Sequence, residues 1–538
     1  MSTHRSPHEY TPDDYRRLLI SGLGSCDSSR RDVEIIGAGI SGLVAGSLLM
    51  RAGFEVRVYE ASHRVGGRIK TLRDGFSSGL YAEAGAMRLP SSHELALRLC
   101  RDFNLQLINF PDTDKNTRVY VNRKHFRSSQ CVDTAGTCNF GEPYRPISAD
   151  AVYNRVLASL KARLKPHWDL ERLRRFQEEW FSKLDAISLG EYLRAFVPSP
   201  ARTELRDPVT GDVIAESEQL SVHDIDMIGF WRGAFDLKGS LLEALRHDAT
   251  AAVSDRYQIL GGMDLLPQSF LRERFCTGSD RPMVDYIHFN ARVVEVTRAA
   301  GTSKYQVRHE HTIQHGRFGD DETTSAADFV VFAVPFAALT HIRLPHDVTA
   351  RKVHAIRNLH YENATKVILE FSERFWDEER ITGGRSYTDL PIRWTFYPTL
   401  QQCVPDSRRG LLLASYTLGE DSLRWTSLRP DDRIRFALRN VAELHSDSSD
   451  QYDTTLKRYE KLLVGGMSHS WAGDEHSFGA FAMFEPHQET ELYDDIWSPE
   501  QHMYFAGEHT SLKHGWIEGA IESGIRVAHE VFEDARCT

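Results

Sequence analysis

The sequence predicts an α/β fold of several domains, and three observations lead to this prediction. The chain has 538 residues, well beyond the roughly 250–300 at which single hydrophobic cores stop growing. Residues 32–60 follow the pattern of a strand, a glycine-rich turn, a small-residue helix and a second strand, which is typical of a Rossmann-type dinucleotide-binding domain. Apolar residues recur at helical spacing between Ala149 and Asp248, whereas short strand-like runs begin at Ile287. We therefore expect a nucleotide-binding domain, a mixed-sheet domain and a helical domain.

The first 31 residues are expected to form an arm outside the main fold. They contain one short helical piece, Asp13–Ile20, and a Gly/Ser-rich end, and their polar start has no secretory apolar core. The apolar stretch Val33–Met50 is long enough to suggest a membrane span, but it contains Glu34 and the glycine-rich turn. We therefore expect no membrane segment, and a cytoplasmic location by default.

The amino-acid composition limits the classes of partner and ligand that the protein is expected to bind. A net charge of −11 argues against nucleic acid, because a phosphate backbone requires clustered basic surface. The seven cysteines form no CxxC pair and are expected to be free thiols. No metal site is expected, since the nearest histidine cluster, His309, His311 and His315, lies in a polar hairpin without cysteines or clustered acids. The acidic stretch Asp320–Glu322 beyond it is expected to be a solvated loop.

The glycine-rich turn has the parts that a dinucleotide requires. Gly37 permits a tight turn, Gly39 lets the backbone approach a pyrophosphate, and Gly42 lets the helix pack closely on the strand. Glu60 closes the second strand, where an acid accepts hydrogen bonds from ribose hydroxyls. An ordinary glycine turn needs none of these neighbours. The expected contacts are Gly37, Gly39, Ile40, Ser41, Gly42, Glu60 and Ala61.

Two further segments favour a flavin over a nicotinamide. Residues 64–68 read RVGGR, so Arg64, Gly67 and Arg68 add a second backbone surface and two cationic donors for the pyrophosphate. Near the other end, YFAGEHT contains Gly507 and Glu508 and precedes a helix whose N-terminus can face the flavin pyrimidine.

An arginine in a small-residue motif is the candidate substrate anchor. Arg88 lies in EAGAMRLP, where its guanidinium could grip a carboxylate through two parallel hydrogen bonds. The alternative is that Arg88 pairs with Glu83 or with the cofactor phosphates. The residues alone leave both open.

Taken together and in this order, GAGISG, Glu60, RVGGR, ADFVVFAVP and YFAGEHT resemble the flavin amine oxidase superfamily from residue 32 onward. The resemblance implies a glutathione-reductase-like flavoprotein that binds FAD. It implies an FAD-binding domain at 32–80, 256–340 and 498–538, a substrate-binding domain at 81–145 and 341–497, and a helical domain at 146–255. Further cofactor contacts are implied for Gly85, Ala86, Met87, Arg88, Val293, Trp516 and Ile517. Lys366 would act near flavin N5, although a strand lysine read alone is usually exposed.

Within the superfamily, GAMRLP, GGRSYTDLP and HGWI resemble L-amino-acid oxidases of the snake-venom and microbial type. This implies that Arg88 and Tyr416 bind the substrate carboxylate, that the Gly515 carbonyl receives the amine, and that Trp516 walls the pocket. Leu418 and Phe481 would contact the substrate side chain, and their bulk suggests apolar or aromatic substrates. His247 is a candidate base or gate, or equally a helix-end histidine that binds terminal carbonyls.

The implied reaction converts an L-amino acid and oxygen to a 2-oxo acid, ammonia and hydrogen peroxide by hydride transfer from Cα to flavin N5. FAD is expected to be noncovalent because Ser511–His514 contains no cysteine. Three alternatives remain: an amino-acid 2-monooxygenase, an amine or polyamine oxidase, and a redox-inactive relative of the guanine-nucleotide dissociation inhibitors. The last has no need of Lys366 or Trp516. We expect a homodimer or a higher homo-oligomer.

Overall fold

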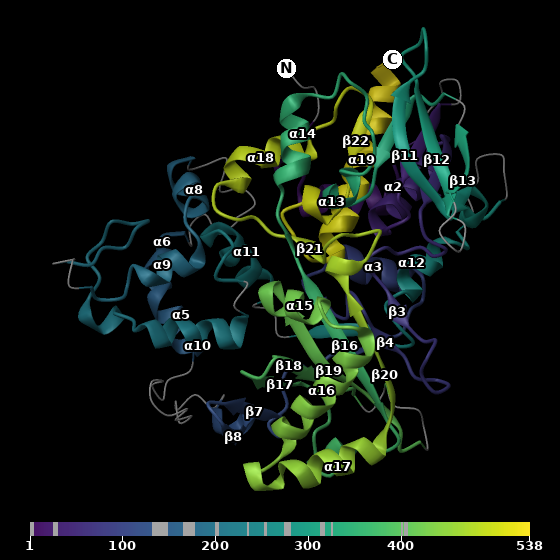
Figure 1. The fold of residues 1–538 in the computed structure, drawn as a ribbon. Helices are drawn as coiled ribbons and strands as arrows, with labels where there is room; N and C mark the ends of the chain where they lie inside the picture. Colours follow the sequence, from purple (N-terminus) through teal and green to yellow (C-terminus); the bar gives the residue numbers. More distant parts are fainter. Residues whose placement is uncertain are drawn as a thin grey trace.

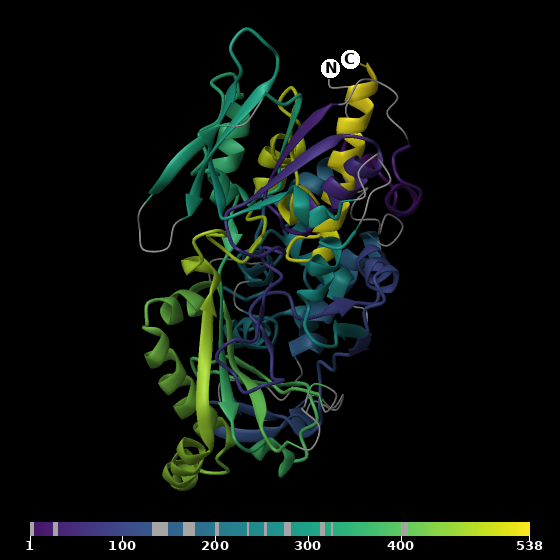
Figure 2. The same cartoon turned by 90° about the vertical axis from the view of Figure 1, so that its right-hand side faces the viewer.

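The computed structural model of the protein has two stacked sheet regions and a helical region at one side (Figure 1). The structure describes residues 5–24, 31–131, 149–164, 178–199, 204–233, 236–251, 255–273, 281–312, 318–323, 326–399, 402 and 407–537. Both ends of the chain lie at the top of both ribbon views (Figures 1 and 2).

A five-stranded parallel sheet forms the core of the upper half, in the order β10-β2-β1-β14-β22. Its strands come from distant parts of the chain: β1 (Asp32–Ile36), β2 (Glu55–Glu60), β10 (Ile287–Phe289), β14 (Phe329–Phe332) and β22 (Met503–Phe505). Successive side chains point to opposite faces of a strand. Val33 and Ile35 accordingly belong to one buried cluster, whereas Ile36 belongs to another.

Both faces of this sheet are covered, as a parallel sheet requires. On one face, α2 (Ile40–Arg51) packs against the long C-terminal helix α19 (Ile517–Cys537). On the other lies an antiparallel sheet of β11 (Ala291–Arg298), β12 (Tyr305–Thr312) and β13 (Phe318–Thr323), seen at the upper left of Figure 2. The predicted strand, turn, helix and strand at 32–60 is therefore confirmed.

Two predictions about local structure are wrong. Asp320–Glu322 was expected in a loop but lies in β13, because this segment pairs antiparallel with β12. Cys131 was expected to be a free thiol but is disulfide-bonded, a pairing that cysteine spacing alone does not predict. Cys100 is a free, buried thiol. The arm helix is confirmed as α1 (Pro12–Ser21), which contacts α19. Just before this helix, Tyr10 Oη forms a hydrogen bond of 2.9 Å with His529 Nδ1 of α19.

The lower half contains a seven-stranded sheet in the order β20-β16-β19-β18-β17-β7-β8 (Figure 1). Its strands are β7 (Arg118–Val121), β8 (Lys124–Arg127), β16 (Ala364–Phe371), β17 (Arg385–Thr388), β18 (Trp394–Phe396), β19 (Gly410–Leu418) and β20 (Leu463–Ser470). The helices beside it are α15 (Gly419–Thr426), α16 (Pro430–His445) and α17 (Tyr452–Leu462). All eight residues of β16 are buried, so both faces of this strand are covered.

Helices fill the side of the molecule at the left of Figure 1. They are α5 (Ala149–Val156), α6 (Ala158–Leu164), α8 (Glu178–Asp185), α9 (Leu189–Arg194), α10 (Val222–Arg232) and α11 (Leu241–Ala251). Their apolar faces share one buried cluster with Tyr387, Trp394 and Phe396 of the lower sheet. The helical region therefore packs directly on β17 and β18. The domain boundaries given above stay predictions.

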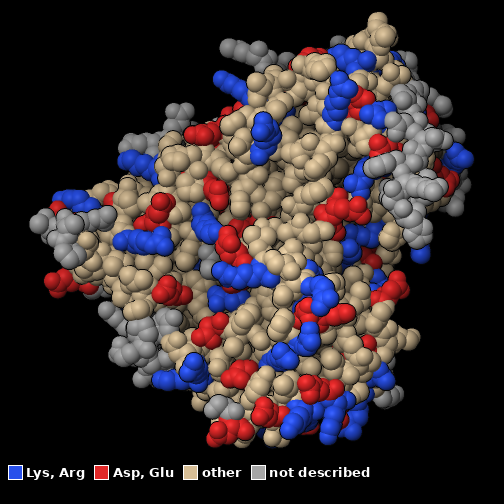
Figure 3. All heavy atoms as spheres, in the orientation of Figure 1, with Lys and Arg blue, Asp and Glu red and all other residues tan. Residues whose placement is uncertain are grey.

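Smaller elements join these parts. They are α3 (Glu94–Asp102), α12 (Leu265–Phe270), α14 (Ala350–Asn358), α18 (Gln488–Trp497), the pair β15 (Tyr361–Glu362) and β21 (Phe481–Ala482), the pair β3 (Thr71–Leu72) and β4 (Ala82–Glu83), and the sheet β5 (Leu89–Pro90), β9 (Arg256–Ile259) and β6 (Leu107–Asn109). No helix among the described residues is long and apolar enough to cross a bilayer. On the face drawn in Figure 3, acidic and basic side chains are interspersed.

Candidate active site

A large cavity of about 610 Å³ is lined by residues of the two sheets and of the helical region. It reaches from the glycine-rich turn of the upper sheet to β16 and β19 of the lower sheet. Among the predicted site residues, those that line it are Gly37, Gly39, Ile40, Ser41, Glu60, Ala61, Arg64, Gly67, Arg68, Gly85, Ala86, Met87, Arg88, His247, Val293, Lys366, Tyr416, Leu418, Phe481, Gly507, Glu508, Gly515, Trp516 and Ile517. Gly42 does not line it, because it is buried where α2 crosses the preceding turn.

The upper end of the cavity fits a dinucleotide. Helix α2 begins there with Gly39 as its N-cap, and no side chain caps the helix. A Cβ on Gly37 would lie 2.7 Å from the carbonyl oxygen of Ala333, and one on Gly42 would lie 2.1 Å from that of Gly37. Because these glycines have no Cβ, the backbone of the turn can pack this closely. The first N–H groups of α2 can then bind a phosphate. Glu60 lines the same end at the close of β2, and its carboxylate accepts a hydrogen bond from the Ala38 N–H at 2.9 Å.

The two arginines of the RVGGR segment differ. Arg64 donates to the carbonyl oxygens of Val65, Ile69 and Gly67, so it braces its own loop, and burial lowers the pKa of its guanidinium. Arg68 forms an ion pair with Glu508 at 2.7 Å. The Glu508 carboxylate also accepts the N–H groups of Ala482 at 3.1 Å and Gly515 at 3.0 Å. Glu508 therefore fixes the loop that carries Gly515 to the cofactor end.

Lys366 is buried at the centre of the cavity wall, with only 1% of its surface exposed. Its Nζ donates to the carbonyl oxygens of Gly85 at 2.7 Å and Glu83 at 3.1 Å, and it lies 4.8 Å from the centre of the Tyr416 ring. Burial lowers the pKa of Lys366 to about 7. Burial likewise raises the pKa of the Glu83 carboxyl to about 7. The expectation of a solvated strand lysine is therefore wrong at this position.

Arg88 pairs with an acid that the sequence did not indicate. Its Nη1 lies 3.0 Å from Oδ1 of Asp112, and Asp112 also pairs with Arg256. Strands β5, β9 and β6 bring these residues together, since Arg88 immediately precedes β5, Arg256 begins β9, and Asp112 follows β6. Burial and the nearby charge of Arg385 lower the pKa of Arg88 to about 10. The pairing of Arg88 with Glu83 does not occur, because Glu83 accepts hydrogen bonds from Met263 N–H and Thr71 Oγ1 instead.

Aromatic rings surround the next part of the wall. The guanidinium of Arg385 lies 4.7 Å from the Tyr387 ring centre and 5.2 Å from that of Trp394. The Trp394 and Tyr416 ring centres are 5.8 Å apart. Arg385, Tyr387, Trp394 and Tyr416 all line the cavity. Tyr416 thus contacts the cation of Lys366 directly, and its neighbour Trp394 contacts the cation of Arg385.

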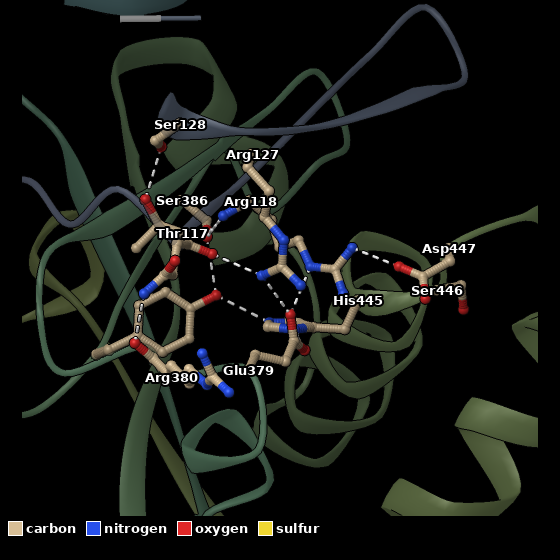
Figure 4. Close-up of polar contacts among 12 residues, drawn as sticks. Thr117, Arg118, Arg127, Ser128, Glu379, Arg380, Ser386, His445, Ser446 and Asp447 are labelled. Atoms are coloured by element: carbon tan, nitrogen blue, oxygen red, sulfur yellow. Dashed lines mark hydrogen bonds and ion pairs between the residues drawn. The ribbon is translucent and has the colours of Figure 1, made fainter. Parts of the chain in front are cut away.

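A buried polar network holds β17 from its other face (Figure 4). Ser386 Oγ accepts the Arg118 N–H at 2.8 Å and bonds Tyr397 Oη, which in turn bonds His445 Nε2 at 2.8 Å. Glu379 accepts from His445 Nδ1 and from Arg118 Nε, both at 2.6 Å. Because side chains alternate along a strand, fixing Ser386 also fixes Arg385 and Tyr387, which point into the cavity.

His247 faces the cavity from α11 and is paired with an acid. Its Nδ1 lies 3.3 Å from Oδ1 of Asp236, and Asp236 also accepts from Arg232 at 3.2 Å. Burial lowers the pKa of His247, but the hydrogen bond and charge of Asp236 outweigh it, so the pKa is raised overall. The ring of Trp516 lies 6.4 Å away. His247 is therefore a cavity residue rather than a helix-end cap.

The loop before α19 forms the remaining wall. Gly515 has a φ of +75°, a backbone conformation that glycine adopts without steric cost. A Cβ at this position would also contact Phe481 at 3.4 Å. Behind the loop, His514 Nδ1 bonds Glu243 of α11 at 2.9 Å within the buried interior. Burial lowers the pKa of His514, but Glu243 outweighs this and raises it overall. This contact ties the loop to the helix that carries His247.

Sequence reasoning missed the charged partners of the site: Asp112, Asp236, Arg256 and Arg385. Arg385 was visible in GGRSYTDLP, whose cationic position could have drawn attention to it. The others had no local signal, because they depend on contacts between distant segments.

Comparisons with known proteins identify the family and the fold of the chain. A family model described as flavin-containing amine oxidoreductase matches residues 40–532. The L-amino-acid oxidase of Mus musculus is 35% identical over 527 residues, covering 96% of this chain and 73% of that protein. The Bacillus subtilis (strain 168) protein YobN is 33% identical over 528 residues, covering 96% of this chain and 98% of that one. The solved cyclohexylamine oxidase from Brevibacterium oxydans IH-35A has the same fold, with a TM-score of 0.64 at 18% identity, covering 94% of this chain and all (100%) of that one.

Proposed function

The chain belongs to the family of flavin-containing amine oxidoreductases, and from this premise we propose that it is an FAD-dependent L-amino-acid oxidase. It oxidises an L-α-amino acid to the imino acid, which hydrolyses to the 2-oxo acid and ammonia, while oxygen is reduced to hydrogen peroxide. The observation that carries the proposal is the continuity of one cavity from the dinucleotide end at Gly39 to the cationic end at Arg88. An amine without a carboxylate would give Arg88 no ligand.

Substrate binding is assigned to three groups. Arg88 and Tyr416 hold the carboxylate, and the Gly515 carbonyl accepts a hydrogen bond from the amine. These contacts orient the Cα–H bond. Leu418, Phe481 and Trp516 line the space left for the side chain, which supports apolar or aromatic L-amino acids.

The cofactor supplies the redox chemistry. When bound, FAD accepts the hydride from Cα at N5 and returns the electrons to oxygen. The chain's part is to present a neutral amine, because the lone pair of the nitrogen assists loss of hydride. The cations Arg88 and Lys366, within a site that excludes water, lower the pKa of a bound ammonium group. His247 is the candidate base that takes its proton.

FAD is proposed to be noncovalent, since residues 511–514 carry no cysteine. Precipitation with acid should release all of the flavin into the supernatant. A homo-oligomeric state and a cytoplasmic location stay predictions, which light scattering and cell fractionation test.

The decisive experiment is anaerobic bleaching of the flavin by single L-amino acids and by the matching amines, with the wild type, Arg88→Ala and the exposed-arginine control Arg424→Ala. Bleaching by apolar L-amino acids that is lost only in Arg88→Ala supports the proposal. Bleaching by amines alone, unaffected by Arg88→Ala, contradicts it. Aerobic products then separate two activities: 2-oxo acid and ammonia indicate the oxidase, whereas carboxamide and carbon dioxide indicate a 2-monooxygenase.

A further inference from the structure

We propose that Arg385 is a second carboxylate-binding arginine, which holds the substrate α-carboxylate together with Arg88 and Tyr416. This inference rests on the proposed function and adds to it a residue with no assigned role.

At the cationic end, guanidinium groups outnumber the carboxylates that pair with them among the described residues. Three guanidinium groups, those of Arg88, Arg256 and Arg385, line this part of the cavity. One carboxylate, that of Asp112, pairs with both Arg88 and Arg256. The charge of Arg385 is thus left without a paired carboxylate among the described residues, and a partly desolvated charge is costly unless an anion joins it.

Of these three arginines, Arg385 has the guanidinium that is most available for hydrogen bonds with a ligand. Among the described residues, no ion pair or hydrogen bond involves its guanidinium, and its Nε is buried without a hydrogen-bond partner. Aromatic rings flank the guanidinium, with Tyr387 at 4.7 Å, Trp394 at 5.2 Å and Phe396 at 5.8 Å. Rings on the flat faces leave the N–H edge of a guanidinium for an acceptor, and a carboxylate matches that edge.

The position of Arg385 points to the α-carboxylate. Trp394 and Phe396, the rings against which it lies, are also packed against Tyr416, at 5.8 Å and 6.2 Å between ring centres. Arg385 and Tyr416 therefore line the same part of the cavity and share Trp394 and Phe396 as ring neighbours. The residues assigned to the substrate side chain, Leu418, Phe481 and Trp516, are apolar or aromatic, so they provide no second anion site.

The backbone that carries Arg385 is fixed on both sides. A Cβ on Gly384 would lie 2.6 Å from the Asp114 nitrogen, so β17 begins in tight contact with the loop that bears Asp112. Beyond Arg385, Ser386 is held by Arg118 and Tyr397 in the buried network (Figure 4). Arg385 is thus pre-organised, which reduces the entropy lost when a ligand binds.

The test measures binding of 4-methylpentanoate and of the uncharged 4-methylpentanamide to the FAD-loaded enzyme by calorimetry. Arg385→Met should weaken 4-methylpentanoate binding about ten- to one-hundred-fold, the effect of one charged hydrogen-bond pair, and leave the amide unchanged. Arg385→Lys, which keeps the charge, should lose less. Arg424→Met is the surface control and should change neither ligand. Flavin content and melting temperature report folding of each variant, and Arg385→Lys serves if Arg385→Met does not fold.

Unchanged binding of 4-methylpentanoate in Arg385→Met would overturn the proposal. A loss confined to turnover of L-glutamate, with L-glutamine and L-leucine unaffected, would also overturn it, because Arg385 would then bind a side-chain acid. Failure of the proposed function is seen separately, as wild-type flavin that no L-amino acid bleaches. The carboxylate titration does not depend on that result.

Discussion

The ammonium group of Lys366 donates a hydrogen bond to the carbonyl oxygen of Gly85 at 2.7 Å. Gly85 belongs to the same segment as Arg88, so one hydrogen bond joins the proposed flavin-side lysine to the proposed carboxylate anchor. Lys366 lies on β16 and the segment of Gly85 follows β4, which places the contact at the junction of the two halves of the molecule.

Lys366→Met should slow anaerobic flavin reduction at neutral pH by about ten-fold, because loss of this cation raises the pKa of the bound ammonium group and each pKa unit lowers the neutral fraction about ten-fold. The variant keeps the length of the side chain and removes its charge and its hydrogen bonds. Lys352→Met is the matched control, because Lys352 is also fully buried and donates to two backbone carbonyls, at 3.2 and 2.7 Å, but does not line the cavity. Stopped-flow absorbance measures both. Equal slowing in the two variants would show that Lys366 acts only through stability.

Asp112→Asn should destabilise the ligand-free protein by about 1.5–3 kcal/mol, because Arg88 and Arg256 lose a shared charged partner. A bound carboxylate should compensate, so 4-methylpentanoate should raise the melting temperature of the variant more than that of the wild type. Thermal unfolding with and without this ligand checks the prediction. Equal ligand stabilisation in both proteins would mean that Asp112 does not compete for the anchor.

Asp236→Asn should shift the acid limb of the kcat/KM profile to lower pH, because Asp236 raises the pKa of His247. The pKa of His247 in the folded protein lies above its unfolded value of about 6.5. Its contribution to stability is therefore fully present below that value and is lost as pH rises through the folded pKa. The stability difference between the wild type and the variant should shrink accordingly above neutral pH.

Asp248→Asn is the control for this shift. Asp248 pairs with the same Arg232 and with Tyr153 Oη at 2.8 Å, but it forms no hydrogen bond with His247 among the described contacts. Its variant should move the acid limb less. An identical shift in the two variants would assign the effect to Arg232 rather than to Asp236.

Gly42→Ala should abolish FAD binding, because its Cβ would lie 2.1 Å from the Gly37 carbonyl oxygen and force the turn to move. Gly46→Ala on the same helix meets only ends of side chains, with Met283 Cε at 3.0 Å and Ile35 Cδ1 at 3.4 Å. It should be near neutral, since alanine stabilises a helix by about 0.5–1 kcal/mol over glycine. Flavin absorbance of the purified proteins measures retention. Full retention in Gly42→Ala would contradict the close packing of α2 on the turn.

Local signals predicted the dinucleotide end of the site well. The spacing of Gly37, Gly39 and Gly42 acts through steric limits within one short segment, so the turn and the start of α2 follow from sequence alone. The burial of Lys366 did not follow, because alternation along β16 indicates one covered face and the structure covers both. The strand β13 was missed for a related reason. It is a strand because it pairs with β12, and its acidic sequence by itself gives no sign of that pairing.

The sequence by itself determined the flavin-binding unit, the α/β class and the residue types of the substrate end, because these depend on short-range sterics and on recognisable motifs. Only the tertiary structure decided which charges meet there. Asp112 joins Arg88 and Arg256, Asp236 joins His247, and Arg385 has no paired anion in the part of the chain that the structure describes. Each of these relationships depends on distances between segments far apart in the chain, and electrostatic energy in a buried site is set by those distances and by the loss of water.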